Sequence, residues 1–227
     1  MPLRAIVFDF DGVLANSEPL HLHAYQEILA DEGLALTEHE YYARYLGYDD
    51  VGMLTTLGED RGRRWVRADI DRLVARKAAR MEILERDHSI LFPGAADVVR
   101  RAAVEVPIAI ASGALGGEIM RVLEREQLTS CFSAIVAAED TPVSKPAPEP
   151  YRKAVELLAQ HFSGELNASD CVAIEDSRWG LESARTAGLR TVGVAQTYDG
   201  SELASADLVI ETIASLDIGE LVQLCRR

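Results

Sequence analysis

Two aspartates stand two positions apart near the start of the chain, at the end of an apolar run. The apolar segment 5–8 (AIVF) precedes Asp9, and Asp11 follows after a single phenylalanine. Side chains two positions apart on a strand point to the same side, so the two carboxylates would crowd together. Such crowding is unfavourable unless a cation or a proton lies between them. The pair therefore indicates a site that binds a cation or transfers protons.

Three further segments place polar residues directly after predicted strands or in the loop that follows one. These residues are Ser112, Gly113, Lys145, Glu175 and Asp176. Ligands of open parallel sheets bind at the carboxyl ends of the strands. We therefore expect these residues to converge with the two aspartates in one crevice.

The residue types in this set suit phosphoryl chemistry. Carboxylate oxygens with few nitrogen or sulfur ligands suit a hard cation, and Mg²⁺ typically takes one or two protein carboxylates and completes its shell with water and phosphate. A hydroxyl, backbone N–H groups and a lysine suit the remaining oxygens of a phosphate. One carboxylate is then left to attack phosphorus, and a second can transfer protons. The set predicts Mg²⁺ as cofactor and a phosphorylated substrate.

Two patterns of hydrophobic residues alternate along the chain. Residues 17–87 carry helix signals and no convincing strand, whereas residues 1–14 and 89–227 alternate short β-branched runs with amphipathic helices. The predicted strands are residues 5–9, 107–111, 134–137, 171–175, 190–195 and 207–210. Strands alternating with helices favour a parallel sheet with right-handed crossovers. The sequence thus predicts an α/β domain interrupted by a helical insert.

The helical insert has its own internal signals. The segment 37–40 (TEHE) has the spacing of a capping box and predicts the start of a helix. A longer helix is expected from about residue 63 to 85, with an apolar stripe that includes Ile70, Leu73 and Met81. We interpret its many arginines, lysines and glutamates as a solvated helix face.

Composition limits the classes of partner. The 227 residues are 48% hydrophobic and 26% charged, with a formal net charge of −14. This acidic balance argues against nucleic acid or an anionic membrane as partner, because both need a basic surface.

The three scattered cysteines read as reduced thiols, and no secretory leader or membrane span is visible. We expect a cytoplasmic protein that acts on a small phosphorylated metabolite. We expect it to be a monomer, and an oligomeric state stays open as the alternative.

Four segments together resemble the motifs of the haloacid dehalogenase superfamily. They are DFDGVLANSE, ASG, SKPAPEPY and IEDSRWGLESARTAG, in the order of that superfamily and across the whole chain. Within it, the chain is similar to the branch that includes phosphoglycolate phosphatases and β-phosphoglucomutase. The resemblance implies a Rossmann-like three-layer α/β/α core, residues 1–16 and 88–227, and an inserted all-α helical cap domain, residues 17–87. It also implies a phosphoric monoester hydrolase.

The resemblance also implies catalytic roles for the two aspartates. Asp9 would be the nucleophile that forms an aspartyl-phosphate. Asp11 would be the general acid that protonates the leaving oxygen and then, as base, activates water. The carboxylates of Asp9 and Asp176 and the backbone carbonyl of Asp11 would bind Mg²⁺, and Glu175 would support the metal shell or bind through water.

Further residues take phosphate-binding roles by the same resemblance. Ser112 and the Gly113 amide would hold the phosphoryl group, and Lys145 would neutralise both this group and the nucleophile. His21 aligns with a mutase histidine that tunes the proton-transferring aspartate. Histidine also occurs at this position in phosphatases. Two interpretations of His21 therefore stay open: a role at the substrate, and a partly buried helix residue without such a role.

One departure separates the chain from the mutases. A mutase has an arginine three residues after a glycine of its cap to hold a second phosphate, and here the segment GYDD places Asp50 there. The leading hypothesis is therefore a Mg²⁺-dependent phosphatase of a sugar phosphate or phosphoglycolate. The alternatives are a phosphomutase, a haloacid dehalogenase that attacks carbon, and a catalytically silent binding protein.

Overall fold

A parallel sheet of six strands is formed by the residues that the computed structural model describes, which are 3–46, 48–84 and 89–226. Its strand order is β3-β2-β1-β4-β5-β6. The strands are β1 (Ala5–Phe8), β2 (Ile108–Ala111), β3 (Phe132–Val136), β4 (Cys171–Glu175), β5 (Arg190–Val194) and β6 (Leu208–Ile210). All six predicted strands are present within a few residues of their expected bounds.

Strand β1 lies at the centre of the sheet. Phe8 pairs with Ile110 of β2 on one side and with Ile174 of β4 on the other. The chain crosses from β1 to β2 on one side and continues from β3 to β4 on the other, so the order of strands reverses next to β1. This reversal is the switch point at which α/β sheets bind ligands. The carboxyl ends of β1, β2 and β4 therefore lie side by side.

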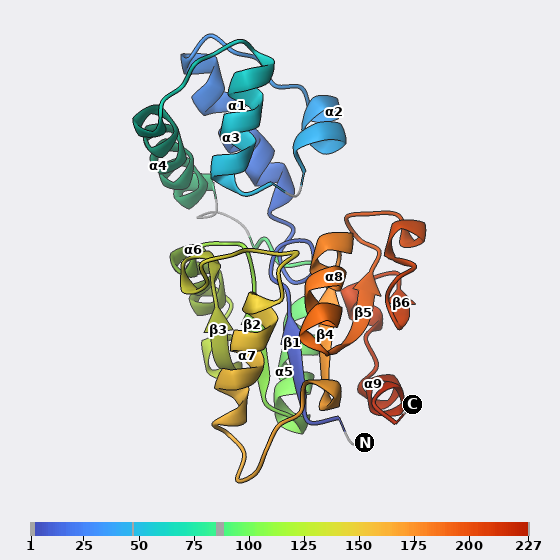
Figure 1. Cartoon of the computed structure of the whole chain (residues 1–227). Helices are drawn as coiled ribbons and strands as arrows, with labels where there is room; N and C mark the ends of the chain where they lie inside the picture. Colours follow the sequence, from blue (N-terminus) through green and yellow to red (C-terminus); the bar gives the residue numbers. More distant parts are fainter. Residues whose placement is uncertain (1–2, 47, 85–88, 227) are drawn as a thin grey trace. The chain divides into compact units, whose positions relative to one another are not determined.

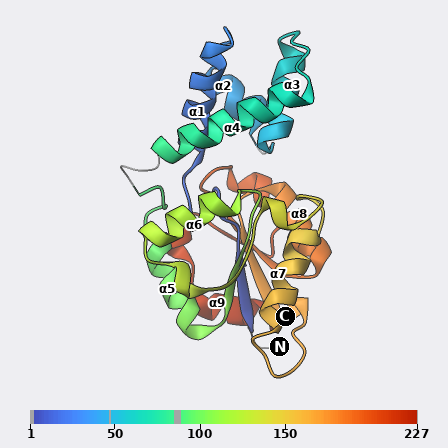
Figure 2. The same ribbon diagram turned by 90° about the vertical axis from the view of Figure 1, so that its left-hand side faces the viewer.

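Helices cover both faces of the sheet (Figure 2). They are α5 (Ala95–Glu105), α6 (Gly116–Arg125), α7 (Glu149–Ala159), α8 (Arg178–Ala187) and α9 (Ile218–Leu224). Helices α7 and α8 pack on one face through a cluster of buried side chains that includes Val7, Ala109, Ala154 and Ala184. Helices α5 and α6 lie on the opposite face. The predicted three-layer α/β/α fold is confirmed.

The described chain divides into two compact units (Figure 1). The core unit contains the sheet and comprises residues up to 16 and from 90 onward, and the helical unit comprises residues 17–89. The predicted boundary between residues 87 and 88 lies outside the described residues. None of the helices in the described part of the chain has the length and apolar character needed to cross a membrane.

The helical unit is built from α1 (Glu18–Asp31), α2 (Glu38–Glu40), α3 (Asp50–Asp60) and α4 (Arg67–Leu84). A cluster of buried apolar side chains, among them Leu29, Leu54 and Leu73, joins these helices. Helix α2 begins with the predicted capping box, in which the hydroxyl of Thr37 accepts a hydrogen bond from the backbone N–H of Glu40. The unit thus has a hydrophobic core of its own.

Candidate active site

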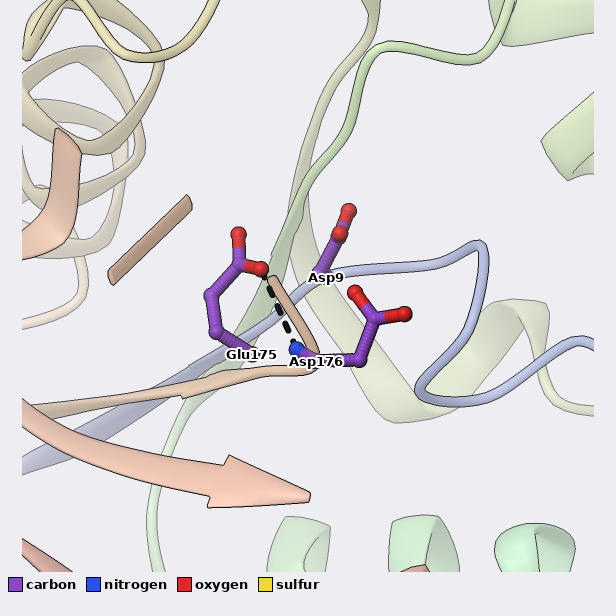
Figure 3. Close-up of side chains that lie close together, drawn as sticks. All are labelled: Asp9, Glu175 and Asp176. Carbon is purple, nitrogen blue, oxygen red and sulfur yellow. Dashed lines mark hydrogen bonds between the residues drawn. The ribbon is translucent and has the colours of Figure 1, made fainter. Parts of the chain in front are cut away.

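Three carboxyl groups meet where strands β1 and β4 end. Asp9 follows β1 directly, Glu175 is the last residue of β4, and Asp176 comes next. One oxygen atom of each group lies within 4.8 Å of the others, and the three side chains lie close together at this end of the sheet (Figure 3). All three residues are buried. The structure therefore brings three of the expected site residues together.

Lys145 supplies the positive charge of this site. It lies in the loop between β3 and α7, and its Nζ is 2.6 Å from Oε1 of Glu175 and 2.9 Å from Oδ1 of Asp9. Burial by itself lowers the pKa of Lys145, but the charges of Asp9 and Glu175 raise it above its ordinary range. The lysine is therefore a fixed cation that bridges two of the three carboxylates.

One lysine does not balance three buried carboxylates. Burial and the charge of Glu175 raise the pKa of Asp9 to about 7, although Lys145 acts in the opposite direction. Burial and the charges of Asp9 and Glu175 raise the pKa of Asp176 well above its usual range. A divalent cation would offset the remaining charge, and oxygen donors without nitrogen or sulfur suit Mg²⁺. The donor set therefore fits a magnesium ion.

Asp11 lies in a tight turn that follows β1. It forms a bridge with Ala15, whose carbonyl oxygen accepts a hydrogen bond of 2.9 Å from the N–H of Gly12. Gly12 has a φ of +76°, and a β-carbon there would lie 1.9 Å from Oδ2 of Asp176. Both facts require glycine at this position. The turn keeps Asp11 near enough for its charge to contribute to the raised pKa of Asp9.

Ser112 follows β2, the strand next to β1. Its N–H donates to the carbonyl oxygen of Val136 at 3.0 Å, and its hydroxyl oxygen accepts from the N–H of Ala114 at 3.0 Å. Ser112 is buried, whereas Gly113 is exposed, and a β-carbon at Gly113 would meet no atom within 4 Å. The strand end therefore offers a fixed hydroxyl beside an open backbone position.

The family of the chain follows from a comparison with known proteins. The model of haloacid dehalogenase-like hydrolases matches residues 6–194, which include the strand ends just described. The chain belongs to this haloacid dehalogenase-like hydrolase family. The resemblance seen in the four sequence motifs is therefore confirmed.

Several relatives in this family match almost the whole chain. The protein CbbY of Rhodobacter capsulatus is 31% identical over 229 aligned positions, which cover 95% of this chain and 96% of that protein. Hexitol phosphatase B of Escherichia coli (strain K12) is 26% identical and covers 97% of both chains. The family and these relatives identify the chain as a hydrolase of the phosphatase type, as the sequence predicted.

Solved structures support the same assignment. The crystal structure of CbbY from Rhodobacter sphaeroides in complex with phosphate has a TM-score of 0.82 and 26% identity, and the match covers 95% of this chain and 96% of that one. A mutant of that protein in complex with xylulose-(1,5)bisphosphate has a TM-score of 0.81.

Tyr151 is not among the predicted site residues, although it lies in the segment SKPAPEPY. Its hydroxyl donates to Oε1 of Glu175 at 2.6 Å from the first turn of α7. The other oxygen of Glu175 accepts from the N–H of Asp176 at 3.2 Å and from the hydroxyl of Ser177 at 3.3 Å. With Lys145, both oxygens of this fully buried carboxylate have partners. Such saturation suits a group that orients its neighbours.

His21, the remaining expected site residue, lies in the helical unit on α1. Its Nδ1 is 2.9 Å from Nζ of Lys77, a residue only 1% exposed. Burial and the charge of Lys77 lower the pKa of His21 to about 3, so the imidazole is neutral. Because Lys77 has no acceptor, Nδ1 accepts and the ring proton is on Nε2. His21 thus offers a neutral N–H donor and no positive charge.

Asp50 is the partner that balances Lys77. Its Oδ1 lies 2.9 Å from Nζ of Lys77 and accepts a hydrogen bond of 2.6 Å from the hydroxyl of Tyr25. The resemblance to the family leads us to expect the phosphate-binding arginine of a mutase at this position. In this chain the position holds an anion that is already paired.

Proposed function

We propose that the chain is a Mg²⁺-dependent phosphatase that hydrolyses a small phosphorylated metabolite, a sugar phosphate or phosphoglycolate, through an aspartyl-phosphate. The observation that carries the proposal is the cluster of Asp9, Glu175 and Asp176, two of whose carboxyl groups contact Lys145. A nucleophile for phosphorus, a cation site and a fixed ammonium are the parts that this reaction requires. A cytoplasmic location and a monomeric state stay predictions from the sequence.

The first half of the reaction transfers the phosphoryl group to the protein. A carboxylate oxygen of Asp9 attacks phosphorus, and the bond between phosphorus and the ester oxygen breaks. Asp11 gives its proton to the leaving oxygen, so the alcohol departs as a neutral molecule. Ser112, the Gly113 amide and Lys145 bind the phosphoryl oxygens during this transfer.

The second half releases phosphate. Asp11, now a carboxylate, takes a proton from water as the water oxygen attacks phosphorus. The bond between phosphorus and the Asp9 oxygen breaks, which releases inorganic phosphate and restores the carboxylate of Asp9. Mg²⁺ supplies neutralisation of the phosphoryl charge when it is bound. Asp9, Asp176 and the carbonyl of Asp11 would hold it, and Glu175 would support this arrangement.

The relatives favour a sugar phosphate among the possible substrates. CbbY has been solved with a sugar bisphosphate and another relative is named as a hexitol phosphatase.

A phosphomutase with the same aspartyl-phosphate is the second candidate. The pairing of Asp50 with Lys77 argues against it, because an anion at this position does not bind a second phosphate. A dehalogenase needs no cation, so the carboxylate cluster argues against that alternative.

A panel of phosphate monoesters tests the proposal. It includes phosphoglycolate, hexose and pentose phosphates and β-glucose 1-phosphate, with phosphate release and isomerisation scored separately in the presence and absence of Mg²⁺. We expect release that requires Mg²⁺ and falls by at least about 1,000-fold in Asp9→Asn. Isomerisation without release would identify a mutase. Release that persists after chelation would contradict the Mg²⁺ requirement, and binding without turnover would identify a silent protein.

A further inference from the structure

The side chain of Gln196 connects three backbone segments that are distant in sequence. Its Nε2 donates to the carbonyl oxygen of Gly12 at 3.1 Å and to that of Val13 at 3.3 Å. Its Oε1 accepts from the N–H of Ile213 at 2.8 Å. The N–H of Ile213 fixes which end of the amide carries the oxygen, so the NH₂ group must face the two carbonyls. The amide is therefore fully oriented.

The two carbonyl oxygens belong to the turn that carries Asp11. Gly12 and Val13 follow it directly, and this turn departs from the regular strand at the positive φ of Gly12. A glycine peptide has many accessible conformations, so an external contact that fixes its plane also fixes the direction of the neighbouring residue. Gln196 supplies such a contact from the segment after β5.

The residue next to Gln196 touches the same site. The hydroxyl of Thr197 forms a side-chain hydrogen bond with Asp176, and this bond lowers the pKa of that carboxyl group against the larger effect of burial. A β-carbon on Gly12 would also lie 2.8 Å from Oγ1 of Thr197. The segment 196–197 therefore contacts both the turn after Asp9 and the end of β4.

We propose that Gln196 is a positioning residue, which holds the turn so that Asp11 delivers its proton to the leaving oxygen. The inference rests on the proposed function, because it assumes that Asp11 is the general acid. Loss of the two hydrogen bonds from Nε2 would let the turn move, and small displacements of a catalytic group cost large factors in rate. The reaction would then depend more strongly on how readily the leaving oxygen departs without a proton.

A comparison of two substrates tests this role. The ester oxygen of p-nitrophenyl phosphate leaves readily without protonation, whereas that of a sugar phosphate needs a proton. We measure kcat/KM for both, because this constant reports the steps up to phosphoryl transfer, and take the ratio of sugar phosphate to p-nitrophenyl phosphate. The ratio does not depend on the fraction of folded enzyme, so a stability loss alone leaves it unchanged.

The variants separate the two functions of the amide. Gln196→Glu keeps the size of the side chain and the acceptor for Ile213 but removes the donors, and Gln196→Ala removes both. We expect the ratio to fall about 5- to 10-fold in each, and to stay at the wild-type value in Gln223→Ala, which changes an exposed glutamine of α9. An unchanged ratio in both Gln196 variants would overturn the inference.

Asp11→Asn keeps this result distinct from the proposed function. We expect the ratio to fall in Asp11→Asn by at least as much as in the Gln196 variants. If it falls there and not in the Gln196 variants, the positioning role alone is wrong. If the ratio does not fall in Asp11→Asn, the acid role of Asp11 is wrong and the inference is overturned as well. The requirement for Asp9 is tested separately by phosphate release in Asp9→Asn.

Discussion

A β-carbon on Gly180 would lie 1.9 Å from the carboxyl carbon of Glu175. Gly180 lies in the first turn of α8, where its N–H donates to the hydroxyl of Ser177 at 3.1 Å. The helix start and the carboxylate at the end of β4 are thus in direct contact, with no room for a methyl group between them. The position of this buried carboxylate depends on glycine at residue 180.

Gly180→Ala is therefore expected to displace Glu175. Overpacking of a buried site costs about 1–3 kcal/mol, and the shifted carboxylate would lose hydrogen bonds to Tyr151 and Lys145. We expect a lower Tm, a fall in kcat/KM of at least about 10-fold and weaker binding of Mg²⁺ in a calorimetric titration.

Gly117→Ala is the matched control for this prediction. It also replaces a glycine in the first turn of a helix, but its β-carbon would meet only Nη1 of Arg121 at 3.8 Å, an ordinary contact. We expect its stability and Mg²⁺ binding to stay near wild type. Equal losses of stability and Mg²⁺ binding in the two variants would show that the contact with Glu175 is not responsible.

Tyr151→Phe removes one hydrogen bond from Glu175 and leaves the packing of the ring intact. The carboxylate keeps Lys145 as a partner of the same oxygen atom, so the substitution removes a single hydrogen bond. A hydrogen bond to a charged group contributes about 1.5–3 kcal/mol of free energy. We expect a reduction in kcat/KM of at least about 5-fold. Steady-state kinetics with saturating Mg²⁺ check this expectation. A wild-type kcat/KM would show that Lys145 alone orients Glu175.

The raised pKa of Asp9 makes the stability of the metal-free protein depend on pH. Between its ordinary pKa of 3.8 and about 7, this group holds more protons in the folded protein than in the unfolded chain. Stability falls with rising pH wherever the folded state binds more protons, so this contribution is lost as the pH rises through that window. Mg²⁺ competes with the proton and binds the carboxylate, so it should stabilise the protein more at high pH.

Thermal unfolding with and without Mg²⁺ measures this effect. We expect the increase in Tm caused by Mg²⁺ to be larger at pH 8 than at pH 5, with about 2–4 °C for each kcal/mol in a chain of this size. Asp9→Asn removes one of the two carboxyl groups with a raised pKa and leaves Asp176, so it should reduce the difference between the two pH values. A Mg²⁺ effect that does not change with pH in the wild-type protein would contradict the prediction.

The sequence predicted the strands and the groups at their ends because both follow from local patterns. Apolar runs of four or five residues define β1, β2 and β4, and polar residues appear where each run stops. Parallel topology then places these ends at one edge of the sheet. The pattern of residues alone is therefore enough to select Asp9, Ser112, Glu175 and Asp176, whereas Lys145 lies in the loop after β3.

Contacts between distant segments could not be predicted in this way. Gln196 and Gly12 are separated by 184 positions, and neither the amide nor its two carbonyl partners carries a periodic signal. The same holds for the contact of Gly180 with Glu175, because it depends on the angle at which α8 leaves the sheet. Such contacts arise from tertiary packing, which local patterns do not encode.

The prediction for the charged side chains of α4 was wrong at one residue. The charges of the segment 63–85 were interpreted as a solvated face, yet Lys77 is 1% exposed. It lies four positions after Leu73 and four before Met81, on the buried stripe of α4. This spacing could have predicted that Lys77 is buried. A lysine on an apolar stripe needs an anionic partner, which here is Asp50.

Lys77→Met is expected to destabilise the helical unit by about 3–5 kcal/mol, because it leaves the largely buried carboxylate of Asp50 without its cation. Hydrogen exchange of α1, α3 and α4 measures this loss within the unit. Adding Asp50→Asn should recover part of it, since the uncompensated charge is removed. Arg67→Met breaks an exposed pair with Asp71 on the same helix and should cost less than about 0.5 kcal/mol. A similar cost for both single variants would mean that the buried pair contributes no more than a surface pair.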